Sequence, residues 1–244
     1  MADKSKTSGA KARPGSAKLG NRAVAVRVKT AKSRDLASTL WLERQLNDPY
    51  VQEAKKLGYR SRAAFKLAQL DDKCRLLKPG MRVVDLGAAP GGWTQIAVER
   101  TKALTSNAKI VALDISPMDP VPPAVVLHLD FTKDSAPDAL KQALDGEADL
   151  VLSDMAAPTT GHRETDHIRI IALADMAYEF AAEVLAPGGA FIAKVFQGGS
   201  EKDLLARLKL DFTTVRHVKP PASRAGSAEV YVVAQGFRRT VQPT

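Results

Sequence analysis

Hydrophobic and polar residues follow one another along this chain in a repeating order that is typical of an α/β protein. Short apolar runs predict buried strands, and the stretches between them carry the 3.6-residue hydrophobic spacing of helices. The predicted strands are Met81 to Leu86, Lys109 to Asp114, Ala124 to Leu129, Asp149 to Asp154, Ala190 to Phe196, residues 212–218 and Glu229 to Ala234. The predicted helices cover residues 93–104, 134–145, the stretch from the end of a polar loop (155–166) to about Leu185, and residues 200–208.

This alternation predicts a Rossmann-like α/β domain with helices on both faces of a single sheet. Connections that contain a helix favour parallel neighbours, so we expect a seven-stranded, mostly parallel sheet. The last two strands are joined by the Pro-rich segment 219–227, which is too short to hold a helix. We therefore expect the last strand to be antiparallel.

A helical extension is predicted ahead of the sheet, over residues 38–73. Its first helix should be interrupted at Asn47-Asp48-Pro49 and closed by Gly58. Ser61 is a candidate N-cap for a second helix that runs through Asp72. Together with this extension, residues 37–244 are expected to form a single domain.

Positive charge is concentrated at the N-terminus. Of the 36 Lys and Arg in the 244-residue chain, 10 fall within residues 1–36, where only 2 Asp or Glu occur. This segment has too little apolar surface to offset the entropy of ordering it, so we expect a disordered basic tail. Such a tail attracts polyanions such as RNA or DNA. A tail that serves only as a linker or for solubility fits the composition equally well.

The remaining composition argues against several classes of protein. The single cysteine, Cys74, cannot form an internal disulfide, which fits a reducing, cytoplasmic setting. No apolar run reaches the ~18 residues of a membrane span, and the basic N-terminus lacks the apolar segment of a secretory signal. The four histidines form no cluster with cysteine, so no metal site is expected.

A glycine-rich turn, Gly87-Ala-Ala-Pro-Gly91-Gly92, follows the first predicted strand. A strand, a glycine-rich turn and a helix form the place where an open α/β sheet binds a nucleotide-like ligand. The dinucleotide pattern Gly-x-Gly-x-x-Gly is not met, and Pro90 lacks an N–H group that could bind phosphate. The turn therefore favours a nucleoside cofactor such as S-adenosylmethionine over a nicotinamide dinucleotide. A tight turn without any ligand is the alternative.

Three of the predicted parallel strands end in an aspartate: Asp114, Asp130 and Asp154. Parallel strands share a carboxyl edge, so these side chains should lie at the same edge as Gly91. Asp114 is placed to accept hydrogen bonds from ribose hydroxyls, and Asp130 is placed to accept one from an adenine amino group. The alternative is that each aspartate only starts a loop as an Asx turn.

Lys194 lies within an otherwise apolar strand, although lysine is almost never fully buried without a partner. The fourth and fifth strands are expected to be neighbours, so Asp154 is its candidate partner. A structural ion pair is one interpretation, but such pairs contribute little to stability. A lysine in a cleft beside a carboxylate is also a candidate catalytic base. Lys66 and Glu229 would join it if the fold brings them to the same cleft.

Seven motifs, in order along the chain, resemble those of the FtsJ/RlmE family of S-adenosylmethionine-dependent ribosomal RNA 2′-O-methyltransferases. The resemblance runs from about residue 39 to 237. The motifs are Ser61-Arg-Ala-Ala-Phe-Lys66-Leu, Val84-Asp-Leu-Gly-Ala-Ala-Pro-Gly-Gly-Trp93, Pro117-Met-Asp119, Leu152-Ser-Asp-Met155, Leu185-Ala-Pro-Gly-Gly189, Lys194-Val-Phe-Gln-Gly198 and Ala228-Glu-Val-Tyr231.

This resemblance implies a class I methyltransferase fold and assigns roles to individual residues. The implied catalytic set is Lys66, Asp154, Lys194 and Glu229. The implied cofactor contacts, for S-adenosylmethionine, are Gly91, Trp93, Asp114, Asp130 and Asp154. Substrate contacts are expected from Arg60, Arg62, Lys66, Lys219 and Arg224.

The implied reaction is methylation of a uridine 2′-hydroxyl in 23S ribosomal RNA, within the assembled large subunit. Lys194 would remove the hydroxyl proton, and no metal would be needed. The large ribosomal subunit is the expected partner of a cytoplasmic monomer. Methylation of transfer RNA and a non-catalytic role as an RNA-binding ribosome assembly factor are the alternatives.

Overall fold

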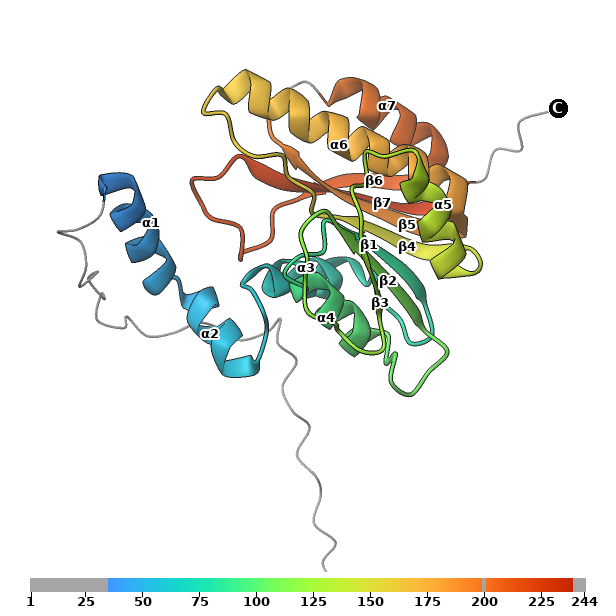
Figure 1. Ribbon diagram of the computed structural model, residues 1–244. Helices are drawn as coiled ribbons and strands as arrows, with labels where there is room; N and C mark the ends of the chain where they lie inside the picture. The colour runs from blue at the N-terminus through green and yellow to red at the C-terminus, as the bar shows by residue number, and fades with distance from the viewer. Residues whose placement is uncertain (1–34, 199–200, 239–244) are drawn as a thin grey trace, which may run out of the picture.

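A seven-stranded sheet forms the centre of the protein (Figure 1), as seen in a computed structural model that describes residues 35–198 and 201–238. The strand order is β3-β2-β1-β4-β5-β7-β6. Strands β1 to β5 pair in parallel, whereas β7 is antiparallel to both of its neighbours. The strands are β1 (Arg82–Leu86), β2 (Lys109–Asp114), β3 (Val125–His128), β4 (Ala148–Ser153), β5 (Leu185–Phe196), β6 (Phe212–Val218) and β7 (Glu229–Phe237). The predicted fold class is confirmed.

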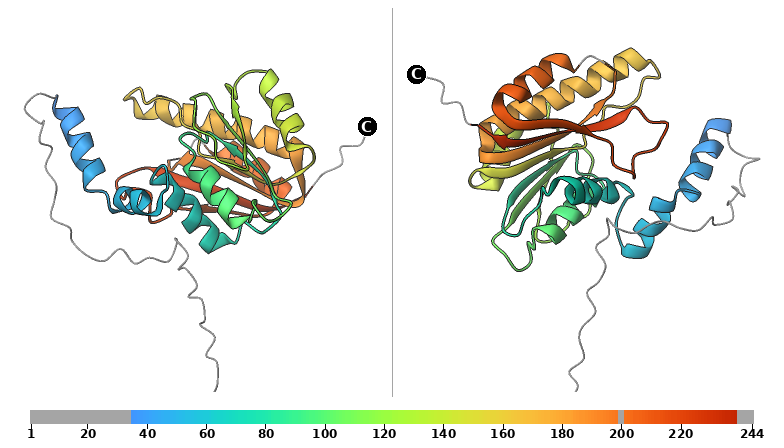
Figure 2. Two further views of the ribbon diagram at one scale, coloured as in Figure 1. Left: turned by 60° about the horizontal axis from the view of Figure 1, so that its bottom comes forward. Right: turned by 180° about the vertical axis from the view of Figure 1, so that it is seen from behind.

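Helices cover both faces of this sheet (Figures 1 and 2). One face packs against α3 and α4, and the other face packs against α5, α6 and α7. Alternate residues of β5 enter the two cores, because Ile192 packs on the α3 side and Phe191 on the α6 side. The helices are α1 (Leu36–Leu46), α2 (Pro49–Leu57), α3 (Ala63–Cys74), α4 (Gly92–Arg100), α5 (Ser135–Leu144), α6 (Arg163–Val184) and α7 (Lys202–Asp211). No helix in these described ranges combines the length and apolar character needed to cross a membrane.

The N-terminal extension consists of α1, α2 and α3, with α1 standing away from the sheet (Figure 2). The predicted break separates α1 from α2. Asp48 is the N-cap of α2, and its side chain accepts a hydrogen bond from the Tyr50 N–H. Gly58 closes α2 in the left-handed conformation (φ 78°), as its lack of a Cβ permits. The predicted tail lies outside the described residues except for Asp35 and Leu36, which begin α1.

Several local predictions were wrong. Helix α6 begins at Arg163, inside the expected loop 155–166. Ser61 does not cap α3, because its hydroxyl faces the first turn of α4, where a Cβ on Gly92 would lie 2.6 Å from it. The fourth helix ends at Arg100 rather than at residue 104. Strand β5 begins at Leu185 instead of Ala190, since a register shift opposite β4 admits the Pro-Gly-Gly segment into the strand.

Candidate active site

Lys194 and Asp154 form a buried ion pair at the carboxyl edge of the sheet. Asp154 directly follows β4, and Lys194 lies near the end of the neighbouring strand β5. The Lys194 Nζ lies 3.0 Å from Asp154 Oδ1 and donates a second hydrogen bond to the Asp154 carbonyl oxygen at 2.6 Å. Lys194 is only 8% exposed, so the protein holds its amine in place at the carboxyl edge of the sheet.

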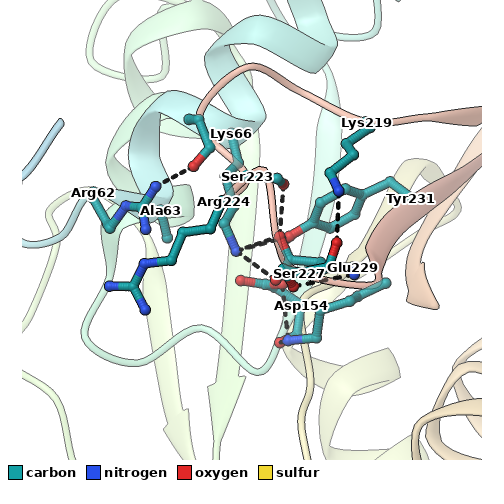
Figure 3. A network of polar contacts seen from close by, with 12 residues as sticks. Arg62, Ala63, Lys66, Asp154, Lys219, Ser223, Arg224, Ser227, Glu229 and Tyr231 are labelled. Carbon is teal, nitrogen blue, oxygen red and sulfur yellow. Dashed lines mark hydrogen bonds and ion pairs between the residues drawn. The ribbon is translucent and has the colours of Figure 1, made fainter. Parts of the chain in front are cut away.

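A second lysine–carboxylate pair, Lys66 and Glu229, lies beside Asp154 (Figure 3). Lys66, on α3, places its Nζ within 2.8 Å of both carboxylate oxygens of Glu229, the first residue of β7. These residues are 163 positions apart, and antiparallel insertion of β7 next to β5 brings them together. The structure therefore gathers all four residues that the resemblance assigned to catalysis.

Tyr231 joins the two pairs, and sequence analysis assigned it no role. Its hydroxyl donates to Asp154 Oδ1 at 2.8 Å and accepts from Lys66 Nζ at 3.2 Å. Burial, together with the nearby carboxylates of Asp154 and Glu229, raises the pKa of Tyr231, so the hydroxyl stays protonated as a donor. The signal was present in the sequence, since Tyr231 lies two residues after Glu229 and a strand repeats every two residues.

The segment between β6 and β7 holds Glu229 in place. Ser223 Oγ donates to Glu229 Oε1 at 2.7 Å, and the neighbouring Ala222 N–H donates to Gln69 Oε1 of α3 at 2.7 Å. Arg62 donates to the Ala222 carbonyl and pairs with Asp48 at 3.0 Å. The N-terminal extension thus anchors the segment that positions Glu229 in the candidate site.

Several residues expected to contact substrate are engaged within the protein. Arg60 donates to the carbonyls of Pro90, Asp119 and Pro120, tying the glycine-rich turn to the following loop. Arg62 is committed to Asp48 and Ala222, as described above. Lys219 and Arg224 remain exposed.

The predicted cofactor cleft is a cavity of about 310 Å³ at the ends of β1, β2 and β4. Its polar walls include Asp114, Asp130 and Thr132. Apolar walls are supplied by Phe131, Met155, Pro158 and Leu173. An apolar slot with carboxylates at its edge suits a nucleoside, whose base is flat and whose ribose donates hydrogen bonds.

Both aspartates of this cleft are held by backbone groups. Asp114 accepts from the N–H groups of Ala89 at 2.9 Å and Ser116 at 2.7 Å. Asp130 Oδ1 accepts from the N–H and the hydroxyl of Thr132, which lowers the pKa of Asp130. Both residues therefore form the Asx turns considered as the alternative. Their oxygens retain further lone pairs that can accept hydrogen bonds from a ligand.

The glycine-rich turn is shaped by close packing. Gly87 has φ 76°, and a Cβ there would lie 2.7 Å from the backbone nitrogen of Met155. Gly91 starts α4 with φ 107°, and a Cβ there would lie 2.8 Å from an Arg60 nitrogen. The Trp93 side chain does not line the cavity. It is buried, donates to the Ala63 carbonyl and lies 5.5 Å from the Tyr231 ring, so only its backbone could meet a cofactor.

Asp85 is a polar residue of this region that sequence analysis missed. It is fully buried in β1, just ahead of the glycine-rich turn, and its Oδ2 accepts from Thr94 Oγ1 at 2.7 Å. Its other oxygen has no hydrogen-bond partner among the described residues. Burial raises the pKa of Asp85 to about 7. A charged residue inside an apolar strand, the signal that identified Lys194, is also present here.

Together, the sheet order and the cavity define an α/β protein with a site suited to a nucleoside near a lysine–carboxylate centre. The model of the family described as FtsJ-like methyltransferase matches residues 59–237. The chain belongs to this family, as the sequence motifs indicated.

Curated relatives with high identity support this assignment. A protein from Paramagnetospirillum magneticum is 67% identical over 221 residues, covering 90% of this chain and 91% of its own length. One from Parvibaculum lavamentivorans is 60% identical over 245 residues, covering 98% and 96%. Both are named Ribosomal RNA large subunit methyltransferase E.

A solved structure shares the fold. The crystal structure of a ribosomal RNA methyltransferase from Plasmodium falciparum superposes with a TM-score of 0.66 at 35% identity. The superposition covers 73% of this chain and 98% of that one.

Proposed function

We propose that the protein methylates the 2′-hydroxyl of a uridine in 23S ribosomal RNA, using S-adenosylmethionine and acting on the assembled large subunit as a cytoplasmic monomer. The family and the names of its relatives support methylation of large-subunit ribosomal RNA. The observation that carries the chemistry is the buried Lys194 amine beside Asp154 at the carboxyl edge of the sheet.

The residues of the cleft fit the cofactor. S-adenosylmethionine supplies an electrophilic methyl group when bound. Asp114 would accept from its ribose hydroxyls, and Asp130 would accept from its adenine amino group. Gly91 and Trp93 are not lining residues of this cavity, so they would contact the cofactor only from the glycine-rich turn beside it, and the apolar walls would enclose the base.

Lys194 is the proposed base. A ribose hydroxyl is a weak acid, so its proton must be taken up as its oxygen forms a new bond. The neutral Lys194 amine would accept that proton and become an ammonium ion. Asp154, 3.0 Å away, would stabilise the positive charge as it forms.

Lys66 and Glu229 would position the ribose. Their side chains are 13% and 15% exposed, so both are mostly buried but not closed off from solvent. Lys66 can donate to a ribose oxygen and so help to orient the ribose. Holding the hydroxyl in line for transfer is itself worth a large part of the rate.

Methyl transfer from labelled S-adenosylmethionine tests the proposal. The acceptors would be intact large subunits, free 23S ribosomal RNA and transfer RNA, followed by mapping of the modified nucleotide. We expect a 2′-O-methyluridine in 23S RNA, with the assembled subunit the best acceptor. Preferential labelling of transfer RNA would overturn the choice of substrate, and no labelling despite cofactor binding would favour an assembly factor.

A further inference from the structure

A second cavity, of about 690 Å³, opens next to the catalytic residues and shares no lining residue with the cofactor cleft. It lies between the start of α6, the end of β5 and the segment joining β6 to β7. Its walls include Arg163, His167, Phe196, Gln197, Lys219 and Ser227. Its volume falls in the range of ~300–1,000 Å³ that is usual for ligand sites.

The walls of this cavity are continuous with the catalytic centre. Phe196 is the register partner of Glu229 across the β5–β7 pair. The Gln197 N–H donates to the Ala228 carbonyl at 2.9 Å, and Ser227 Oγ accepts from the Glu229 N–H at 3.2 Å. A ribose held at Glu229 would therefore have its own base within reach of this cavity.

His167 lines the cavity and has a ring nitrogen that no described residue pairs with. The residue is 8% exposed, and its Nε2 has no hydrogen-bond partner among the described residues. Its ring lies edge-on to the half-buried ring of Phe196, with centroids 6.4 Å apart. An aromatic face and an unpaired imidazole nitrogen are groups that proteins use to stack and read an unstacked RNA base.

The mouth of the cavity carries positive charge. Arg163 and Lys219 are exposed there. The Lys219 ammonium donates to the carbonyls of Ala225 at 3.3 Å and Ser227 at 2.6 Å, which leaves one of its three N–H donors for a ligand. The acidic neighbour Asp166 binds the N–H and hydroxyl of Thr160 through Oδ1. Backbone phosphates would be attracted to this rim.

We propose that this cavity holds the base of the nucleotide whose ribose is methylated, with His167 bonding to the base edge and Phe196 contacting its face. The inference rests on the proposed function and extends it. The target uridine would be turned out of its strand into the cavity, as happens in enzymes that carry out chemistry on a base. Arg163 and Lys219 would bind the flanking phosphates.

Substitution of His167 tests the contact with the base edge. His167→Phe keeps an aromatic ring but removes the polar nitrogen, so we expect the KM for large subunits to rise about ten-fold. His167→Asn, which restores a hydrogen-bonding group, should recover part of that loss. The affinity for S-adenosylmethionine, measured by calorimetry, should be unchanged in both variants, which also shows that they are folded.

Charge at the rim is tested with a matched pair on the same helix. Arg163→Gln should raise the KM for RNA and reduce its dependence on salt, because one phosphate contact is lost. Arg169 is also an exposed arginine of α6, but it does not line the cavity. The control variant Arg169→Gln should therefore leave the KM unchanged.

Photocrosslinking tests the position of the base directly. RNA carrying 4-thiouridine at the mapped target position should crosslink to peptides containing His167, Phe196 or residues 225–228. If the wild type methylates RNA, two results would each overturn the inference. One is crosslinking only to other peptides, and the other is an unchanged KM in both His167→Phe and Arg163→Gln. Absence of any methyl transfer by the wild type would instead reject the proposed function, and this inference with it.

Discussion

The Tyr231 hydroxyl donates a 2.8 Å hydrogen bond to Asp154 Oδ1, the same oxygen that lies 3.0 Å from the Lys194 amine. One carboxylate oxygen therefore receives both a neutral donor and a charged one. Because Tyr231 also accepts from Lys66, it couples the two lysine–carboxylate pairs into one network. The orientation of Asp154 depends on this buried tyrosine as well as on its ion pair.

Tyr231→Phe should lower kcat and leave cofactor affinity unchanged. The substitution keeps the ring packed against Trp93 and removes only the hydroxyl. Loss of one hydrogen bond to a charged group is worth about 1.5–3 kcal/mol, so we expect kcat to fall by about 10- to 100-fold. Single-turnover methyl transfer at saturating cofactor measures this, and an unchanged rate would show that Asp154 needs no help from Tyr231.

Lys194→Ala should abolish methyl transfer while retaining cofactor binding. Removing a general base typically costs about 10²- to 10⁴-fold in rate. Labelled methyl transfer and calorimetric titration with S-adenosylmethionine together separate these effects. The exposed Lys209→Ala of α7 is the control and should be fully active. Full activity of Lys194→Ala would refute its assignment as the base.

Asp114→Ala should weaken S-adenosylmethionine binding, because the variant loses the proposed acceptor of the ribose hydroxyls. Hydrogen bonds to a charged acceptor contribute about 1.5–3 kcal/mol, which predicts a rise in Kd of about 10- to 100-fold. Asp134→Ala, an exposed aspartate outside the cleft, should bind normally. Equal affinities of the two variants in calorimetry would remove Asp114 from the cofactor site.

Asp85 makes stability depend on pH. Burial raises its pKa to about 7, above the ordinary value of about 4, so the folded state binds this proton more tightly than the unfolded state. Stability is therefore lost as the pH rises from about 4 to 7, by up to ~1.4 kcal/mol per pH unit.

The Asp85→Asn variant removes that titration. Its free energy of unfolding, relative to wild type, should increase steadily between pH 5 and 7 and then level off. Urea unfolding of the cofactor-free protein at several pH values measures the difference. Asp134→Asn should show no such trend, and a flat difference for Asp85→Asn would mean that the carboxyl group is already ionised at pH 5.

Gly87→Ala should be more damaging than Gly80→Ala. Both glycines have positive φ (76° and 85°), so backbone strain is common to the two variants. Only at Gly87 would the new Cβ meet backbone atoms of Met155, at 2.7 and 2.8 Å, whereas nothing lies within 4 Å at Gly80. We expect an additional loss of about 1–3 kcal/mol of stability in Gly87→Ala. Equal unfolding midpoints for the two variants would show that the loop after β4, which contains Met155, moves to accommodate the new Cβ without loss of stability.

Much of the fold was predictable because its signals are local. Strands β2 and β6 match the predicted ranges, since each is a short run bounded by polar residues or a turn. Lys194 could be identified as a candidate site residue because a lysine in an apolar strand needs a partner. The expected parallel pairing of its strand with the preceding one pointed to Asp154, which the structure places 3.0 Å from it.

Other features depend on contacts between distant segments. The insertion of β7 between β5 and β6 follows from the packing of the whole sheet, and no local pattern specifies it. Arg62 was expected to bind substrate, but it forms an ion pair with Asp48. That pairing depends on how α2 packs next to α3, which no local sequence pattern specifies. The cavity beside His167 likewise arises from three separate segments of the chain.

The position of β7 in the sheet has a consequence for folding during protein synthesis. Lys66, Asp154 and Lys194 all precede β6 in the sequence, but Glu229 and Tyr231 are carried by β7, which follows it. That strand also separates β5 from β6, so the edge of the sheet stays open until β7 is translated. A growing polypeptide therefore cannot assemble the proposed catalytic set until β7 has been synthesised, and we expect a product truncated ahead of residue 229 to be inactive.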